Sequence, residues 1–139
     1  MRNFSFSRSS TENMRGVHPD LVVVFTEAIK NSPIDFGIPD TGGLRTAGDQ
    51  NTLFQNGVSK CDGVDKVSYH QTGNALDFYA YINGKASWDK IQLSIIAGVI
   101  LATAKRLRKE GKVTNEVKWG GTFGSDSFHG WDMPHFEIS

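Results

Sequence analysis

The sequence predicts a small single α+β domain, in which a short and mostly antiparallel sheet packs against helices. Three observations predict this class. Apolar residues recur with helical spacing after Pro19, a longer apolar stretch runs from Trp88 to about Glu110, and residues 75–82 alternate apolar with polar side chains as strands do. A chain of 139 residues is long enough for one hydrophobic core.

The N-terminal part of the chain is expected to hold one helix. It runs from Pro19 to about Asn31, because proline suits the first helical turn and Ser32-Pro33 ends the helix. Its inner face carries Leu21, Phe25, Ala28 and Ile29. Residues 1–16 are polar and lack a clear period, so we expect an N-terminal arm or a short packed lead-in before a domain of residues 17–139.

The next part of the chain is expected to be richer in loops. Phe36–Ile38 is an apolar piece that suits either a strand or a loop. A second helix is expected over Asn51–Asn56, with Leu53 and Phe54 facing inward. Residues 58–67 are expected to form a loop.

Two segments are predicted to be strands with one face in the core. The strand over Ala75–Ile82 places Asp77 on the face away from the core. Its core face carries Leu76, Phe78 and Ala80. The last strand turns Phe136 toward the core, and His135 and Glu137 away from it.

Between these strands, Asn83-Gly84 is a turn signal and Trp88 to about Glu110 is a long helix expected to form the core. Its most apolar part, Ile91–Ala104, has about 14 residues, whereas a membrane span needs roughly 20. No membrane insertion is therefore expected.

Composition narrows the class of protein further. The 15 Lys and Arg residues balance 15 Asp and Glu residues, which disfavours nucleic acid as a partner. A single cysteine, Cys61, cannot form an internal disulfide. The first residues lack the apolar segment of a secretory signal, so synthesis in the cytosol is expected.

Imidazole and carboxylate groups are concentrated in two polar clusters, residues 68–77 before the long helix and residues 128–136 after it. A catalytic zinc site takes two histidines and a carboxylate as one of its standard ligand sets. His70, Asp77 and His135 could supply these ligands in a cleft on the sheet, since Gly73 lets the chain turn between the first two. Asp132 would then be the general base. Spacing alone leaves a plainer interpretation open, in which the histidines lie on the surface and the aspartate forms a turn.

The motif Ser68-x-His70-x-x-Gly73-x-Ala75-x-Asp77, followed by Asp132-x-x-His135 and preceded by Gly43-Leu44-Arg45-Thr46, resembles a family of zinc peptidases. Its members are D-alanyl-D-alanine carboxypeptidases and L-alanyl-D-glutamate peptidases. The sequence looks most like the bacteriophage endolysins of this family, from about Val17 to the C-terminus. Other matching positions are Gln50, Leu53-Phe54, Tyr81-Ile82-Asn83-Gly84, Trp119-Gly120-Gly121 and Pro134-His135-Phe136.

The resemblance implies a role for each matching residue. It makes His70, Asp77 and His135 the ligands of one zinc ion per chain, and Asp132 the catalytic carboxylate that deprotonates water and protonates the leaving amine. Arg45 matches the arginine that steadies the scissile carbonyl and its oxyanion, although a surface salt bridge is the alternative. Candidate substrate contacts are Arg45, Ser68, Gln50 and Trp119.

Some other polar and aromatic residues lie outside the zinc ligand set. His129 could reach the cleft, but a histidine beside glycine is more often simply exposed. Cys61 is not expected as a fourth ligand, because a closed fourth position would exclude water. Trp119 and Trp131 suit either the wall of a substrate groove or packing against backbone.

The resemblance implies a zinc-dependent peptidoglycan hydrolase that cleaves the L-Ala–D-Glu bond and lyses the phage's host. Many carboxypeptidase members have Glu where this chain has Asp132, which favours the endopeptidases. The alternatives are a D-Ala-D-Ala carboxypeptidase and a non-catalytic zinc-containing module that binds the wall. We expect a monomer that is made in the host cytoplasm and reaches the peptidoglycan after a separate protein permeabilises the membrane.

Overall fold

The computed structural model describes residues 3–122 and 132–139. Within them, short strands form two three-stranded sheets in which every pairing is antiparallel, with the orders β1-β3-β4 and β2-β6-β5. The helices are α1 (Arg8–Asn13), α2 (Pro19–Asn31), α3 (Ala47–Gln55) and α4 (Lys90–Lys109), with 3₁₀ helices η1 (Tyr69–Thr72) and η2 (Gly120–Thr122). The strands are β1 (Phe36–Gly37), β2 (Ala75–Asp77), β3 (Tyr79–Ile82), β4 (Lys85–Ser87), β5 (Val117–Trp119) and β6 (His135–Ile138).

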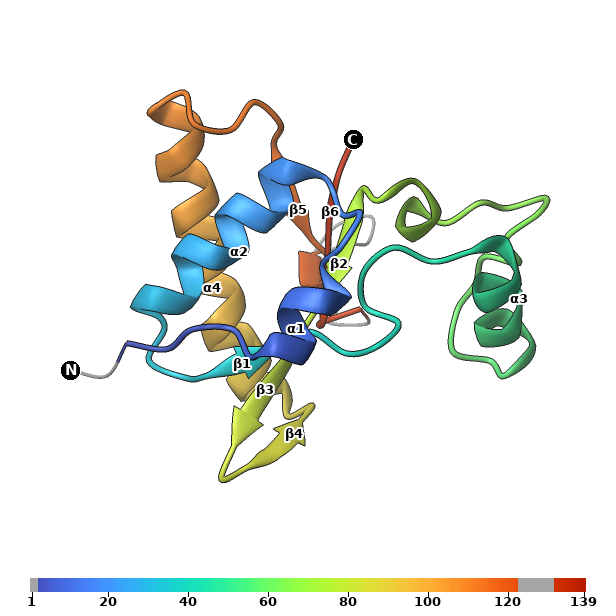
Figure 1. Ribbon diagram of the computed structural model, residues 1–139, viewed down its shortest axis with the longest axis horizontal. Coiled ribbons are helices and arrows are strands. Elements are labelled where there is room, and N and C mark those ends of the chain that lie inside the picture. The colour runs from blue at the N-terminus through green and yellow to red at the C-terminus, as the bar shows by residue number, and fades with distance from the viewer. Residues whose placement is uncertain (1–2, 123–131) are drawn as a thin grey trace.

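Helices α2 and α4 pack together on one side of the sheets, whereas α3 and its neighbouring loops project on the other side (Figure 1). The predicted α+β class is confirmed, with two small sheets in place of one. None of the helices in residues 3–122 and 132–139 combines the length and apolarity that a membrane crossing requires.

The bounds of α2 are as predicted, and α4 begins slightly later than predicted. Pro19 occupies the first turn of α2, and the His18 side chain accepts a hydrogen bond from the Asp20 N–H. Helix α4 begins at Lys90 rather than Trp88, because the Asp89 side chain caps it and strand β4, which the sequence did not predict, lies just before it.

The predicted strand over residues 75–82 is divided into β2 and β3 at Phe78. The Phe78 N–H donates to the Pro134 carbonyl, 2.9 Å away, so the chain leaves one sheet and enters the other. The predicted alternation is confirmed, because Leu76, Phe78 and Ala80 are buried. Asn83 and Gly84, both with positive φ, form the two-residue turn to β4.

Helix α3 differs from the prediction in both its bounds and its buried face. It begins at Ala47 rather than Asn51, because the Thr46 side chain caps it by accepting from the Asp49 N–H. Its buried residue is Gln50, whereas Phe54 is 40% exposed. The inward orientation predicted for Phe54 is therefore wrong, since this helix lies beside the loops and apart from the main core.

Residues 3–16 pack on the rest of the domain, which is one of the two arrangements that the sequence predicted. Helix α1 is capped by Ser7, and the buried Ser10 hydroxyl accepts a hydrogen bond from the Ile38 N–H. The Phe6 ring meets Phe36 edge-on with 5.4 Å between centroids. Phe6 therefore packs against the core together with the rest of the domain.

The core beneath strand β6 is aromatic. Phe25, Phe78 and Phe136 are fully buried, and the Phe25 and Phe136 rings meet edge-on at 5.6 Å. Phe136 anchors β6 from below, so the alternate residues His135 and Glu137 point to the opposite face, as predicted. The core thus fixes the strand from which the candidate site is built.

Candidate metal centre

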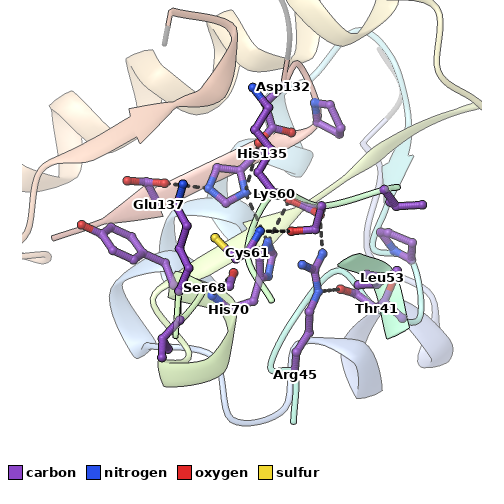
Figure 2. A pocket seen from close by; sticks show the side chains of 18 of the residues that line it. Thr41, Arg45, Leu53, Lys60, Cys61, Ser68, His70, Asp132, His135 and Glu137 are labelled. Atoms are coloured by element: carbon purple, nitrogen blue, oxygen red, sulfur yellow. Dashed lines mark hydrogen bonds and ion pairs between the residues drawn. The ribbon is translucent and has the colours of Figure 1, made fainter. Parts of the chain in front are cut away.

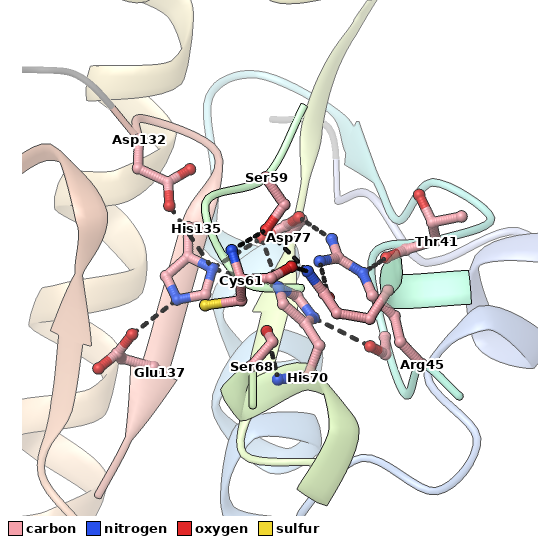
Figure 3. A network of polar contacts seen from close by, with 12 residues as sticks. Thr41, Arg45, Ser59, Cys61, Ser68, His70, Asp77, Asp132, His135 and Glu137 are labelled. Carbon is pink, nitrogen blue, oxygen red and sulfur yellow. Dashed lines mark hydrogen bonds and ion pairs between the residues drawn. The ribbon is translucent and has the colours of Figure 1, made fainter. Parts of the chain in front are cut away.

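Three side chains from different elements converge at one point. His70 comes from η1, Asp77 ends β2, and His135 begins β6 directly opposite Asp77 in the antiparallel ladder. His70 Nε2 and His135 Nδ1 lie 3.2 Å apart, and Asp77 Oδ1 lies 3.2 Å from the first and 3.1 Å from the second (Figure 3). The spacing of these atoms allows them to bind one metal ion.

The other nitrogen of each imidazole is held by a second group. His70 Nδ1 lies 2.9 Å from the Gly43 carbonyl, and His135 Nε2 lies 2.8 Å from Glu137 Oε1. Each partner accepts the proton of that nitrogen, so His70 Nε2 and His135 Nδ1 remain for a metal. Metal-binding histidines are oriented in this way in many proteins.

A glycine and a cap place His70. The predicted turn at Gly73 is confirmed, because this residue has a φ of +78° and a Cβ there would lie 2.6 Å from the Gly16 carbonyl oxygen. The Ser68 hydroxyl accepts from the His70 N–H, and Ser68 and Gln71 form a reciprocal capping box. Ser68 also lines the cleft, where the sequence predicted a substrate contact.

Burial and the neighbouring polar groups shift the pKa values of Asp77 and His135 in opposite directions. Burial alone would raise the pKa of Asp77, but the neighbouring His70 and His135 lower that pKa well below its ordinary value. Burial alone would lower the pKa of His135, but its hydrogen bonds with Asp77 and Glu137 raise that pKa to about 10. The groups around the three ligand atoms therefore favour positive charge at the point where these atoms meet.

Arg45 is held by three acceptors. Its Nε donates to the Thr41 carbonyl at 2.7 Å, Nη1 to Gln50 Oε1 at 3.0 Å, and Nη2 to Asp77 Oδ2 at 3.0 Å. Burial lowers the pKa of the guanidinium, and the charges of Asp77 and Asp132 oppose this shift. Because Arg45 occupies Oδ2 of Asp77, Oδ1 is the oxygen that remains for a metal.

Gln50 contacts protein groups inside the structure. It is fully buried, and its Nε2 donates to the Ser59 hydroxyl at 2.7 Å and to the Cys61 carbonyl at 2.8 Å. Its Oε1 accepts from Arg45. Gln50 is not among the described residues that line the cleft, so the structure gives it a supporting position rather than the surface position that a substrate contact needs.

Trp119 also lies away from the cleft surface. Its indole is 7% exposed, stacks on Phe136, and donates through Nε1 to the Met133 carbonyl at 2.7 Å. Trp119 thus has the packed position of the two that the sequence left open, and its contact with substrate stays a prediction. His129 and Trp131 lie outside the described residues.

Asp132 reaches the site from the chain segment just before β6. Its Oδ2 lies 3.9 Å from His135 Nδ1, and its side chain is 30% exposed to solvent. Burial raises the pKa of this carboxyl, and the charge of Asp77 raises it further, while His135, His70 and Arg45 oppose the shift. Asp132 therefore has a partly buried carboxyl next to the point where the ligands meet.

The ligand atoms open into a cleft of about 660 Å³ (Figure 2). His70, Asp77, His135, Asp132 and Arg45 all line it. Its other walls come from residues 58–61 and 66–69, from Pro39 and Thr41, and from Trp88.

The residues present fit a catalytic zinc ion. Two imidazole nitrogens and one carboxylate oxygen are a standard donor set that leaves the fourth position open. Each imidazole donates a supporting hydrogen bond to an outer oxygen, and Asp77 accepts one from Arg45. Cys61 lines the cleft but is not part of the converging group. The described residues thus leave a position for water or substrate.

Known proteins resemble this chain along most of its length. The family model for the phage L-alanyl-D-glutamate peptidase matches residues 2–139. This match includes residues 2–16, which precede the resemblance found from the sequence motifs. The L-alanyl-D-glutamate peptidase of Escherichia phage T5 is 37% identical over 90 residues, which are 65% of this chain and 64% of that relative. The chain therefore aligns with less than two thirds of the phage T5 protein.

A solved structure agrees with both the fold and the family. The L-Ala D-Glu endopeptidase ChiX of Serratia marcescens matches with a TM-score of 0.74 and 32% identity, covering 99% of this chain and 92% of that chain. The matched region thus extends over both sheets and over the segments that carry the candidate site. Together with the family model, this match shows that the chain belongs to the phage L-alanyl-D-glutamate peptidase family.

Proposed function

We propose that this protein is a zinc-dependent peptidoglycan hydrolase that cleaves the L-Ala–D-Glu bond of stem peptides during phage lysis of a host. The observation that carries the proposal is the convergence of His70, Asp77 and His135 beside Asp132 in an open cleft. The names of the two relatives support the choice of bond.

The zinc site consists of His70 Nε2, His135 Nδ1 and Asp77 Oδ1. A zinc ion bound there supplies a Lewis acid for the scissile carbonyl and lowers the pKa of a bound water toward 7. The Gly43 carbonyl and the Glu137 carboxylate keep the two imidazoles in the orientation that this binding needs.

Asp132 moves the proton in this proposal. Its carboxylate takes a proton from the attacking water at Oδ2 and then gives it to the nitrogen of the leaving D-Glu. Partial burial, which raises the pKa of Asp132, suits a group that must both accept and return a proton near neutral pH.

Arg45 has two roles. It holds Asp77 through Oδ2, and it places a permanent positive charge in the wall of the cleft, where negative charge develops on the carbonyl oxygen. Ser68 orients η1 and borders the substrate path.

The catalytic machinery belongs to residues 17–139, and α1 serves as a lead-in that packs on the core. We further propose that the protein works as a monomer with one zinc ion. We propose as well that it is made in the host cytoplasm and reaches the wall once the membrane is permeabilised.

Mass spectrometry of digested peptidoglycan tests this proposal. The protein should generate stem fragments that begin with D-Glu, a chelator should abolish them, and added zinc should restore them. Asp132→Asn should retain zinc but lose at least about 100-fold in kcat. Release of free D-alanine would indicate the carboxypeptidase alternative, and a folded, zinc-loaded protein that generates no new termini would indicate a wall-binding module.

A further inference from the structure

Three aromatic side chains form a cluster next to the cleft. Tyr79 and Tyr81 lie on β3, and Trp88 lies between β4 and α4. The Tyr79 ring centroid is 5.8 Å from that of Trp88 and 6.5 Å from that of Tyr81. Trp88 is 52% exposed and Tyr81 is 44% exposed, so the cluster presents a large apolar surface to solvent.

This exposed surface is continuous with the cleft. Trp88 and the metal ligand Asp77 both line the same cavity. Tyr79 and Tyr81 follow Asp77 at alternate positions, on the face of the chain that points away from the core. At about 3.3 Å per residue, Tyr79 lies no more than about 7 Å along the chain from Asp77 and Tyr81 no more than about 13 Å.

A large exposed aromatic surface beside a cleft is typical of a ligand contact. The family's substrate offers a matching group, because the L-Ala of a peptidoglycan stem is joined through a lactyl group to an amino sugar. The L-Ala and the lactyl group together span about 7 Å, at roughly 3.5 Å per unit. A sugar ring at this separation from the scissile carbonyl is thus within reach of the aromatic cluster, since Trp88 and Asp77 line the same cavity.

We infer that Trp88, supported by Tyr79, binds the muramic acid ring that carries the stem peptide. The apolar C–H face of a pyranose packs on the face of an indole, while its hydroxyl groups stay in water. The cluster therefore serves as a sugar subsite on the L-Ala side of the scissile bond. This inference rests on the proposed function, because it assigns the substrate's orientation in the same cleft.

The test compares two soluble substrates that differ only at the sugar. One is an N-acetylmuramyl tripeptide that begins with L-Ala–D-Glu, and the other is the same tripeptide with an N-acetyl group in place of the muramyl group. The zinc-loaded protein should cleave the first with a kcat/KM about five- to tenfold higher, the size expected of one aromatic contact. Trp88→Ala should abolish this preference, because it lowers kcat/KM for the muramyl tripeptide more than for the acetylated one.

Two further variants complete the design. Trp88→Phe keeps a ring and should retain part of the preference. Ile91→Ala changes a residue that is 72% exposed on α4 and is not among the described residues that line the cleft, so it should behave as the wild type. The melting temperature of each variant reports folding.

The inference is overturned if the wild type shows no preference for the sugar, if Trp88→Ala keeps the preference, or if a folded Trp88→Ala loses both activities equally. In these three results the wild type still cuts the L-Ala–D-Glu bond, so the proposed function stands. If the wild type cuts neither tripeptide at this bond, the proposed function itself fails, and the sugar subsite fails with it.

Discussion

Replacing Gln50 with leucine is expected to destabilise the protein by about 3 kcal/mol and to lower kcat more than it raises KM. The side chain is fully buried and makes three hydrogen bonds, one of them with a guanidinium. A hydrogen bond to a charged group contributes about 1.5–3 kcal/mol and a neutral one about 0.5–1.5 kcal/mol. Together the three hydrogen bonds contribute about 2.5–6 kcal/mol. The apolar burial of leucine offsets part of this contribution, so the expected loss is near the lower end of the range, at about 3 kcal/mol.

The catalytic effect follows from the same contacts. Without Gln50 Oε1, the Arg45 guanidinium loses one of the three acceptors that orient it toward Asp77. The loop that carries Ser59 and Cys61 loses two of its hydrogen bonds to α3. Because Gln50 does not line the cleft, substrate binding should change less than the chemical step.

Urea unfolding and steady-state kinetics on the acetylated tripeptide measure the two effects. Gln55→Leu is the matched control, because it makes the same substitution at an exposed position of the same helix and should stay within about 0.5 kcal/mol of the wild type. A Gln50→Leu variant as stable as this control, or one with a raised KM and an unchanged kcat, would refute the supporting role of Gln50.

Three other predictions follow from the core and the site. Arg45→Lys should lower kcat by about 100-fold with zinc retained, as measured by single-turnover kinetics and metal analysis, because one ammonium cannot satisfy three separated acceptors. Phe136→Ala should cost about 3–5 kcal/mol in urea unfolding, since the ring is fully buried beneath β6. In the metal-free protein, folding raises the pKa of His135 from 6.5 to about 10, so this residue's stabilising contribution should be complete below pH 6.5 and decrease as the pH rises toward 10. Melting temperatures of the metal-free protein across this range measure the decrease, and a stability that rises over the range would contradict the assigned hydrogen bonds of His135.

The sequence predicted well where the signals are local. Pro19 and Ser32-Pro33 delimit α2, and the alternation around Asp77 places this carboxylate on the correct face of its strand. Sequence alone could not show the bend at Phe78, because it depends on a hydrogen bond to Pro134, which is distant along the chain. The exposed Phe54 was misassigned because α3 packs against loops and not against the core.

For the candidate site too, local motifs predicted some features, and others depend on contacts between distant parts of the chain. His70 and Asp77 lie in one short motif, but their convergence with His135 depends on the antiparallel register of β2 and β6, which no local pattern reveals. Positions that match the family made both Gln50 and Trp119 candidates for substrate contact. Neither is among the described residues that line the cleft, whereas Arg45 is.

Zinc-edge anomalous diffraction from crystals of the zinc-loaded protein is the most direct test of the proposed centre. The account predicts one strong peak per chain, bound by His70 Nε2, His135 Nδ1 and Asp77 Oδ1, with a fourth position open toward Asp132. The absence of a peak among these three atoms, or a fourth position closed by a protein ligand such as Cys61, would contradict it.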